Sequence, residues 1–569
     1  MERDIGSAEQ SRVPGEDRPG LLGARVSRRT VLRALMVSAF AGGSSSLIAA
    51  CSGGQTSPSS AVAAKPASQA PGASPAAAGT QVTQVKEGGT LRYGLSSDPP
   101  SLDPHVDTGY ASQLVKGTIY SLLVRPDPKM QIVPDLAESW ETPDDKTYVF
   151  HLRKNVKWHD GSEFTSADVK ATIERIQDPK TGAYARGDLL VIDKIDTPDA
   201  LTVKFTLKNP DAPFLAVLAG SNSLIASKAL LDKGADLKNQ IVGTGPFKMG
   251  DYQPGVHEKL VRNENYYIPG RVHLDGITFT PYPDDTSRVT ALRTGAVDII
   301  DYVPWKDMST IEADKKLALY SDKEGAMMFL VMRVDKPPLN NPKVRQAISY
   351  AIDRKAVLDT VFFGRGRVLG GLPTPQWMFT YSPDRQDVYT LNPEKSKQLL
   401  AEAGYPNGFK IELLSTSTYA MHKDTAEIVQ AGLKNVGIDV SLDLTDWATT
   451  VARRAKGDFQ LHVNGAGVEL ADPAYLNQYF SSTGPYFSWT GFSDKQVDDL
   501  LARGQATSNV DQRKQIYRDL EQRLLDLSTI SWICTREQAE ATQAYVKNYV
   551  HMPGANRSQQ KVVEVWLDK

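Results

Sequence analysis

Residues 409–444 carry the clearest pattern of apolar and polar positions in the chain. The stretches FKIELLS (409–415) and IDVSLDL (438–444) read as strands, since each is short and built around apolar residues. Between them, KDTAEIVQAGLKNVG (423–437) repeats apolar residues at helical spacing. A strand, a helix and a second strand in this order predict a βαβ unit, with the two strands parallel and the crossover right-handed.

The flanking segments extend this pattern. Pro393 and Glu394 predict the start of a helix that Gly404 ends. Residues 340–363 begin with Asn-Asn-Pro and repeat apolar residues at helical spacing, which predicts another helix. A further helix and strand are predicted in DWATTVARRAKGDFQLHV (446–463). The C-terminal half is therefore predicted to be α/β.

The middle of the chain has consecutive strands instead. Residues 147–176 alternate at first, turn at Asp160-Gly161 and then become helical, with Thr165 or Ser166 as the helix N-cap. ALTVKFTLKN (200–209) is a second alternating strand. Residues 285–303 predict a helix closed near Gly295 and then a strand. This order of elements is typical of an α+β arrangement.

The first 50 residues predict an export signal. The apolar run from Ala34 to Ala50 is shorter than a membrane span and is interrupted by glycines and serines. Such a run after basic residues is typical of a secretion signal. Arg28 and Arg29, in SRRTVLR, resemble the twin-arginine export signal. LIAAC, ending at Cys51, resembles a bacterial lipobox, in which the cysteine is acylated and becomes the mature N-terminus.

Residues 51–86 predict a disordered tether. Ser, Ala, Pro, Gly and Gln dominate, so there is too little apolar surface to offset the entropy of ordering. A tether behind a lipidated Cys51 would hold a soluble domain at a membrane surface, and stable anchoring needs more than one acyl chain. The predicted location is extracytoplasmic, in the periplasm or on the outer face of the cytoplasmic membrane.

Length, charge and cysteine content narrow the class of protein. Without residues 1–50 the chain keeps 519 residues, which predicts two or three lobes. That leader carries seven arginines and five acidic residues, so its removal changes the formal net charge from −2 to −4. This near-balance gives no electrostatic indication of nucleic-acid binding. With Cys51 lipidated, Cys534 has no partner for a disulfide and is interpreted as a buried small hydrophobe.

Motifs for catalysis and for cofactors are missing from the part predicted to fold. It contains no H-E-x-x-H, C-x-x-C, G-x-S-x-G or phosphate-binding loop, and GTGPF from Gly243 is not a dinucleotide loop because Pro246 follows the second glycine. The sequence therefore predicts no metal site, no cofactor and no enzyme activity. An exported hydrolase using paired carboxylates stays as a remote alternative.

Four longer stretches carry a family resemblance, and they lie in this order: SLDPHVDTGYASQLVKGTIYSLLV, PDLAESWETPDDKTYVFHLRKNVKWHDGSEFTSADV, VGTGPFKMGDYQPGVHEKLVRNENYY and PPLNNPKVRQAISYAIDRKAVL. Together they resemble the solute-binding proteins of bacterial peptide and nickel ABC transporters, named extracellular solute-binding protein family 5. The resemblance implies a two-lobed clamshell of the type II-like periplasmic-binding-protein fold, α/β and α+β, with an accessory domain. The implied division is lobe I at 87–130, 225–325 and 530–569, the accessory domain at 131–224, and lobe II at 326–529.

The same resemblance implies a function in capture rather than in catalysis. A monomeric receptor would bind di- or oligopeptides between its lobes and deliver them to a membrane permease with its ATPase subunits. Nickel, as a small chelate, and oligosaccharides are the alternatives within the family. Closure by hinge motion is expected near Gly325–Phe329 and around residues 525–533.

Glu469 is the residue that the resemblance places on the ligand's α-ammonium. In peptide-binding relatives an acidic residue three positions before an acidic-Pro pair has this role, and the pair here is Asp472-Pro473. The sequence departs from the family pattern in two ways, because the usual residue is Asp and because Ala466 stands where an aromatic residue often does. Asp472 itself is predicted to cap the helix that follows.

Further candidates for ligand contact lie in both lobes. Asp107, Thr108 and Tyr110, after the LDP turn, are expected to face the ligand from lobe I. Four aromatic residues lie in predicted loops or at the starts of elements in lobe II: Trp377, Tyr419, Trp447 and Trp489. Trp447 follows a predicted strand at its carboxyl end, where α/β sheets bind ligands.

Overall fold

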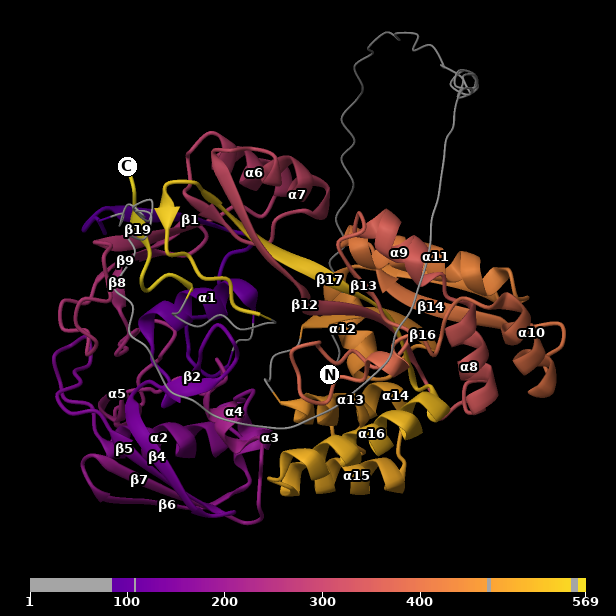
Figure 1. Ribbon diagram of the computed structural model, residues 1–569, viewed down its shortest axis with the longest axis horizontal. Helices are drawn as coiled ribbons and strands as arrows, with labels where there is room; N and C mark the ends of the chain where they lie inside the picture. The colour runs from indigo at the N-terminus through magenta and orange to yellow at the C-terminus, as the bar shows by residue number, and fades with distance from the viewer. Residues whose placement is uncertain (1–83, 107–108, 468–471, 554–560) are drawn as a thin grey trace, which may run out of the picture. The chain divides into compact units, whose positions relative to one another are not determined.

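The structure is a computed structural model that describes residues 84–106, 109–467, 472–553 and 561–569 (Figure 1). The predicted export signal with Arg28 and Arg29, the lipidation site Cys51 and nearly all of the tether lie outside these residues. Asp107, Thr108 and Glu469 lie outside them too. No helix in the described ranges is both long enough and apolar enough to cross a membrane.

A single mixed sheet runs through both halves of the described chain. Its strands follow the order β15-β14-β16-β12-β17-β11-β1-β10-β9-β8, and β13 pairs with β17 beside this path. The strands are β1 (Thr90–Leu95), β8 (Phe247–Gln253), β9 (His257–Arg262), β10 (Gly276–Pro281), β11 (Ile299–Ile300), β12 (Leu317–Met332), β13 (Gly366–Val368), β14 (Lys410–Thr416), β15 (Asp439–Thr445), β16 (Leu461–Gly467) and β17 (Ile530–Gln543).

The two longest strands, β12 and β17, connect the two ends of this sheet. They pair antiparallel from Leu317↔Gln543 to Val331↔Ile530, and Figure 1 shows them side by side between the indigo-to-magenta and the orange parts of the ribbon. The register shifts between Asp322 and Ala326 and again between Met328 and Phe329. β12 also pairs with β16, whereas β17 also pairs with β11. The two halves are therefore joined by the backbone pairing of β12 and β17, which is irregular at the two register shifts.

The predicted βαβ unit is confirmed. β14 and β15 are parallel, with Lys410 opposite Asp439, and α11 (Ala420–Lys434) connects them. β14 is also parallel to β16, so the predicted second helix and strand complete a parallel layer. α11 buries Ala426, Val429 and Leu433 against the apolar core of this half, as helical spacing requires.

In the other half, β1 lies between β10 and β11 and is parallel to both. The hairpin β8–β9 continues the sheet beyond β10 in antiparallel pairing. The predicted helix closed at Gly295 is α6 (Asp285–Arg293), and the predicted strand after it is β11. α1 (Tyr110–Ile119) and α7 (Trp305–Glu312) are the other helices that bear on the site described below. GTGPF is a packing motif here, because a Cβ on Gly243 would lie 1.9 Å from the carbonyl oxygen of Ile119.

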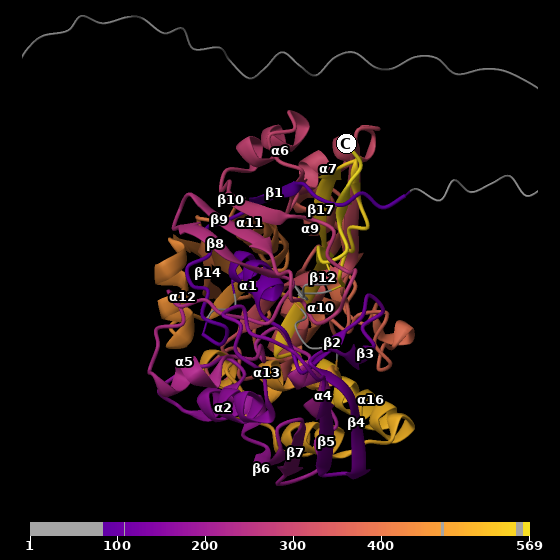
Figure 2. The ribbon, with the colours of Figure 1, turned by 90° about the vertical axis from the view of Figure 1, so that its left-hand side faces the viewer.

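A separate antiparallel sheet follows the order β4-β5-β7-β6 (Figure 2). Its strands are β4 (Ala137–Asp144), β5 (Thr147–Leu152), β6 (Ile192–Asp199) and β7 (Thr202–Leu207), and the hairpin β2 (Val124–Pro126) and β3 (Ile132–Pro134) precedes it. α2 (Ser166–Gln177) packs against this sheet and begins at the predicted N-cap Thr165, in a capping box with Asp168. The short helices here are α3 (Arg186–Leu189), α4 (Phe214–Leu218) and α5 (Lys228–Asp232).

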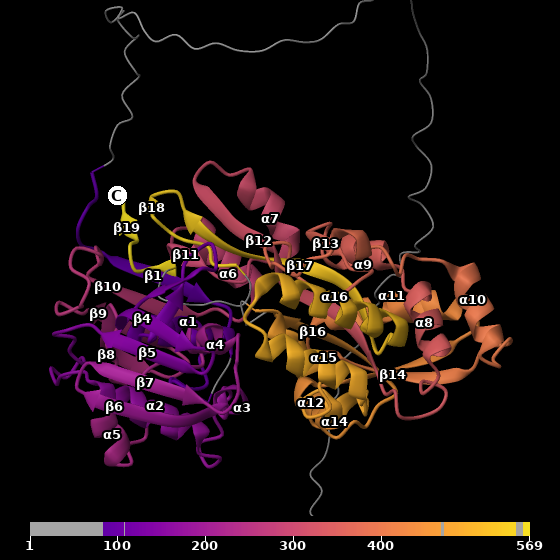
Figure 3. The same cartoon turned by 60° about the horizontal axis from the view of Figure 1, so that its bottom comes forward.

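The remaining helices belong to the C-terminal half (Figure 3). They are α8 (Pro342–Ala351), α9 (Arg354–Val361), η1 (Pro383–Arg385), α10 (Pro393–Glu402), α12 (Trp447–Ala455), η2 (Pro473–Leu476), α13 (Asn477–Phe480), α14 (Phe487–Thr490), α15 (Lys495–Ala506) and α16 (Val510–Leu527), and the small pair β18 (Val546–Lys547) and β19 (Trp566–Leu567) ends the fold. The helical pattern over 340–363 forms two helices, because the Asp353 carboxylate caps α9 at the backbone amide of Ala356.

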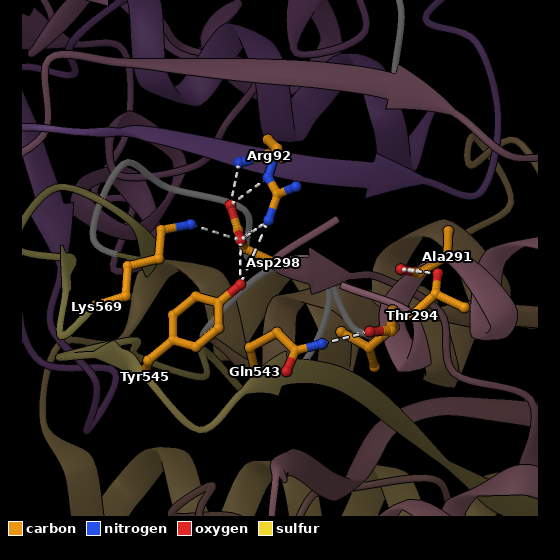
Figure 4. A network of polar contacts seen from close by, with 8 residues as sticks. Arg92, Ala291, Thr294, Asp298, Gln543, Tyr545 and Lys569 are labelled. Carbon is orange, nitrogen blue, oxygen red and sulfur yellow. Dashed lines mark hydrogen bonds and ion pairs between the residues drawn. The ribbon is translucent and has the colours of Figure 1, made fainter. Parts of the chain in front are cut away.

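Asp298 ties the last residues of the chain to the main sheet (Figure 4). Its fully buried carboxylate accepts hydrogen bonds from the Arg92 guanidinium, from the Tyr545 hydroxyl at 2.6 Å and from the Lys569 ammonium at 3.3 Å. Burial alone would raise the pKa of Asp298, but the hydrogen bonds from Arg92 and Tyr545 outweigh it and lower the pKa. The carboxylate is therefore kept charged inside the fold.

Candidate functional site

Aromatic side chains gather where the parallel strands β14 and β15 end. Tyr419 follows β14 by three residues, and Trp447 follows β15 after the N-cap Asp446. Their rings meet edge to face, with centroids 5.2 Å apart. β16, the third parallel strand, ends at Gly467, next to the undescribed residues 468–471. Carboxyl ends of parallel strands are where open α/β sheets bind ligands.

Arg454 brings a third predicted aromatic residue into this group. Its guanidinium lies over the ring of Trp489 at 4.2 Å from the centroid and over the ring of Trp447 at 5.6 Å. His422 contacts both Trp447 and Tyr419. We name these five residues the Trp447 cluster. Three of the four aromatic residues that the sequence singled out in the C-terminal half therefore belong to one surface.

The polar atoms of the Trp447 cluster are incompletely paired. Arg454 donates from Nη1 to the side-chain oxygen of Asn464 at 3.0 Å, whereas its buried Nε has no hydrogen-bond partner in the described residues. Burial lowers the pKa of Arg454. Burial also lowers the pKa of His422 to about 4, so its imidazole is neutral at pH 7. The cluster thus presents a cationic guanidinium between two indoles, which suits stacking and anion contact.

Trp377 lies apart from this cluster. Its side chain is 36% exposed, and it makes no ring contact with another aromatic residue in the described part of the chain. Its contact with ligand stays a prediction.

A second group of side chains lies beside the middle of the paired strands β12 and β17. Arg536, in β17, donates from Nη1 to the Tyr302 hydroxyl at 2.5 Å and contacts the sulfur of Met421 at 3.3 Å. Tyr302 in turn meets the ring of Tyr110 edge to face, at 6.1 Å. Met421 is the neighbour of His422 in α11, so this group reaches the Trp447 cluster. We name Tyr110, Tyr302, Trp305, Met421 and Arg536 the Arg536 cluster.

The Tyr110 hydroxyl also donates to Glu540 at 2.7 Å. Glu540 accepts in addition from the buried ammonium of Lys561 and from Nδ1 of His551 at 2.6 Å, and Nε2 of His551 donates to Asp322 at 2.9 Å. We name Asp322, Glu540, His551 and Lys561 the Glu540 network. Burial alone would raise the pKa of Glu540, but the charges of Lys561 and His551 outweigh it and lower the pKa well below its usual range.

Asp472 has the predicted capping role and a second one that the sequence did not indicate. Its Oδ1 accepts from the backbone amide of Ala474 at 2.9 Å, at the start of η2. Both carboxylate oxygens also accept from Arg513, at 2.7 and 2.9 Å.

Cys534 is fully buried as predicted, and burial raises the pKa of its thiol to about 12.

Cavities and metal-ligand groups do not single out another site. A cavity of about 280 Å³ lies between α8, α10 and α16, lined by Tyr350, Arg385 and Tyr389 among others, and it shares no residue with either cluster. Among the described residues, no group of three or more His, Cys, Asp or Glu is arranged to hold a metal ion.

Comparison with known proteins identifies the class. The family model for bacterial extracellular solute-binding proteins, family 5 (middle), matches residues 131–488. The glutathione-binding protein GsiB of Escherichia coli (strain K12) is 31% identical over 437 residues, which cover 74% of this chain and 84% of GsiB. The fold and these matches define a solute-binding protein of an ABC transporter. The chain belongs to family 5 of the bacterial extracellular solute-binding proteins.

Solved structures agree with this assignment. AgaA from A. tumefaciens R10, in complex with agropinic acid, is 39% identical with a TM-score of 0.76, and the match covers 84% of this chain and 99% of AgaA. DppA from Helicobacter pylori, in complex with the peptide STSA, is 27% identical with a TM-score of 0.74, covering 85% and 99%. The predicted family and mixed α/β periplasmic-binding-protein fold are therefore confirmed.

Family membership settles the coarse function. The protein is an extracytoplasmic solute-binding protein that works with an ABC transporter. The family is non-catalytic, so the prediction that the chain is not an enzyme is confirmed and the hydrolase alternative is set aside.

Proposed function

We propose that the protein captures short peptides or peptide-like conjugates of amino acids and delivers them to a membrane permease with its ATPase subunits. The observation that carries this proposal is the position of Tyr419 and Trp447 directly after two parallel strands, beside Arg454. Aromatic faces and a guanidinium suit a ligand with an amide backbone and a carboxylate. Similarity to GsiB, named for glutathione, and to DppA with its bound peptide supports this ligand class.

An opine is the second candidate ligand. AgaA, which binds agropinic acid, has the higher identity of the two solved relatives compared above, 39% against 27%. A peptide with a free C-terminus and agropinic acid both carry an acidic group, so both suit a site that contains guanidinium groups. Nickel chelates and oligosaccharides remain further outcomes of a binding screen.

The ligand would lie between two lobes. Lobe I would comprise residues 87–130, 225–325 and 530–569, and lobe II residues 326–529, with the accessory domain at 131–224. The antiparallel pair β12–β17 supports this division, because these two strands connect the two ends of the main sheet. Their register shifts near Ala326 and Phe329 suit a bending point.

Glu469 would hold the α-ammonium of a peptide. It follows the carboxyl end of β16, the third parallel strand, by two residues. A buried ammonium requires a fixed negative partner. We expect Glu469→Gln to weaken peptides with a free N-terminus by one to two decades, about 1.5–3 kcal/mol, and to leave N-acetylated peptides nearly unchanged.

Calorimetry with glutathione and the tetrapeptide STSA, each free and N-acetylated, tests the ligand class and this role together. Equal losses for free and acetylated ligands would exclude Glu469 from the ammonium site. If the wild-type protein binds neither ligand, the peptide proposal fails and agropinic acid is the next ligand to titrate.

Export and anchoring form a separate proposal. We expect the mature protein to begin at an acylated Cys51 and Cys51→Ala to give an uncleaved or soluble form. Mass spectrometry of the mature N-terminus checks this, and an N-terminus without acyl mass would contradict it.

Replacing Arg28 and Arg29 by Lys should block export through the twin-arginine route. Normal export of that double variant would exclude this route.

A further inference from the structure

Most of the buried arginines in the described part of the chain have oxygen acceptors for their side-chain donors. Five arginines there are at most 6% exposed: Arg288, Arg345, Arg354, Arg513 and Arg536. Four of them donate to carbonyl or carboxylate oxygens. Arg345 and Arg354 donate to backbone carbonyls, Arg288 to carbonyls and Asp285, and Arg513 to Asp472 and a carbonyl. The donors of these four guanidinium groups thereby find oxygen acceptors inside the fold, although Arg345 and Arg354, like Arg536, have no carboxylate partner among the described residues.

Arg536 is different. Its side chain donates only to the Tyr302 hydroxyl and to the sulfur of Met421, and both donations come from Nη1. The buried Nε has no partner in the described residues, and no described carboxylate lies within 4.0 Å of the guanidinium. A guanidinium stays charged in a protein and is costly to bury without an anionic partner.

The contacts around Arg536 leave one edge of the guanidinium without a hydrogen-bond partner in the described residues. The rings of Tyr302 and Trp305 flank it, with centroids 6.0 and 5.9 Å away, and Nη1 is occupied. Nε and Nη2 form the remaining edge, whose two parallel N–H groups match the two oxygens of a carboxylate. The backbone of Arg536 is held on both sides, by Ala326 of β12 and by Gly366 of β13, so the side chain starts from a rigid position.

We propose that Arg536 binds the carboxylate of the transported solute through its Nε–Nη2 edge, and that this protein selects acids over their amides and esters. The inference rests on the proposed function, because it names the chemical group of the ligand that would bind beside the paired strands β12 and β17. Tyr302 orients the guanidinium through the hydrogen bond to Nη1. Met421 connects this position to the neighbouring Trp447 cluster.

The proposal is tested by comparing the binding of free acids with the binding of forms whose carboxylate is blocked. The probes are the tetrapeptide STSA and its C-terminal amide, glutathione and its diethyl ester, and agropinic acid. We expect Arg536→Gln to weaken the free acids by about 100-fold and to leave the blocked forms, already weak, nearly unchanged. Arg536→Lys should recover part of the loss because it restores charge without the two-pronged geometry. Arg518→Gln, which changes an exposed guanidinium paired with Asp384, is the matched control and should bind like the wild type.

The stability of the ligand-free protein gives a second readout that needs no ligand. Arg536→Met removes an uncompensated buried charge, so its melting temperature should equal or exceed that of the wild type, whereas Arg513→Met should melt lower. Equal binding of free acids by wild type and Arg536→Gln would overturn the proposal. A fall in the melting temperature of Arg536→Met would also overturn it, by indicating a structural anion within the chain. If no probe binds the wild type, the proposed function fails and the ligand-free melting temperatures decide the Arg536 question alone.

Discussion

Replacing Glu540 by Gln is expected to lower the free energy of unfolding by about 3–5 kcal/mol, because it leaves buried cations without their carboxylate. The Lys561 side chain is 2% exposed and that of His551 is 14% exposed. After the change, Asp322 is the remaining carboxylate of the Glu540 network. Chemical denaturation measures the loss.

A second substitution separates charge from shape in this network. Glu540→Gln combined with Lys561→Met removes the stranded ammonium and should recover part of the stability. Glu312→Gln, at a pair with Arg365 in which the Glu312 side chain is 45% exposed, should cost at most about 1 kcal/mol. A Glu540→Gln protein as stable as the wild type would show that the network contributes nothing.

The same network predicts how stability changes with pH. Burial alone would lower the pKa of His551, but the Glu540 charge and the hydrogen bonds to Asp322 and Glu540 raise it to about 9. Because this pKa is raised in the folded state, the stabilisation is complete below the unfolded pKa of about 6.5 and is lost as the pH rises through 9. Wild-type stability should therefore fall between pH 6.5 and 9, and Glu540→Gln should reduce this slope. An unchanged slope would contradict the assignment.

Replacing Arg513 by Met is expected to cost about 3–5 kcal/mol as well, because it breaks a buried ion pair and strands Asp472. The side chains are 6% and 9% exposed, and Arg513 donates to both oxygens of Asp472. The ion pair also affects the pKa of Asp211. Burial and the charges of Asp188 and Asp472 raise this pKa to about 7, and the charge of Arg513 acts in the opposite direction. Loss of Arg513 therefore leaves these acids without a compensating cation.

Thermal and denaturant unfolding of Arg513→Met measure this cost. Adding Asp472→Asn should restore part of the stability, because Asn keeps the cap on η2 and removes the stranded charge. Arg518→Met, at an exposed pair with Asp384, is the control and should change stability by less than about 1 kcal/mol. If Asp472→Asn lowers the stability of Arg513→Met further, the stranded charge is not the cause.

Local patterns in the sequence predicted much of the fold. The strands and helix of the βαβ unit, the cap at Thr165 and the stop at Gly404 depend on neighbouring residues, so they can be read directly from the chain. The location of Trp447 at the carboxyl end of a parallel strand could be predicted because Trp447 follows a recognisable strand in the sequence. The break between α8 and α9 was missed because Asp353, a helix cap, lies inside an otherwise continuous helical pattern.

The sequence did not indicate the charged residues of the candidate site, for a different reason. Arg536 and Glu540 lie in a segment whose pairing partners in β11 and β12 are more than 200 residues away. Nothing in the neighbouring sequence shows that Tyr302 and Tyr110 meet these side chains. Arg454 looks like an ordinary helix-surface arginine until Trp489 is brought beside it by the packing of α14 against α12. Long-range pairing, and not local pattern, brings together the cationic residues of the candidate site.

The position of β17 also constrains the order in which the protein folds. This strand lies between β11 and β12 in the sheet, yet it is made after more than 90% of the chain has been synthesised. Until then, β11 and β12 each lack their neighbour and expose unpaired edges, which are prone to pair with other chains. Completion of the sheet must wait for synthesis to pass residue 543, and closing such distant contacts is slow. The topology therefore requires that the edges of β11 and β12 be protected from pairing with other chains until β17 has been synthesised.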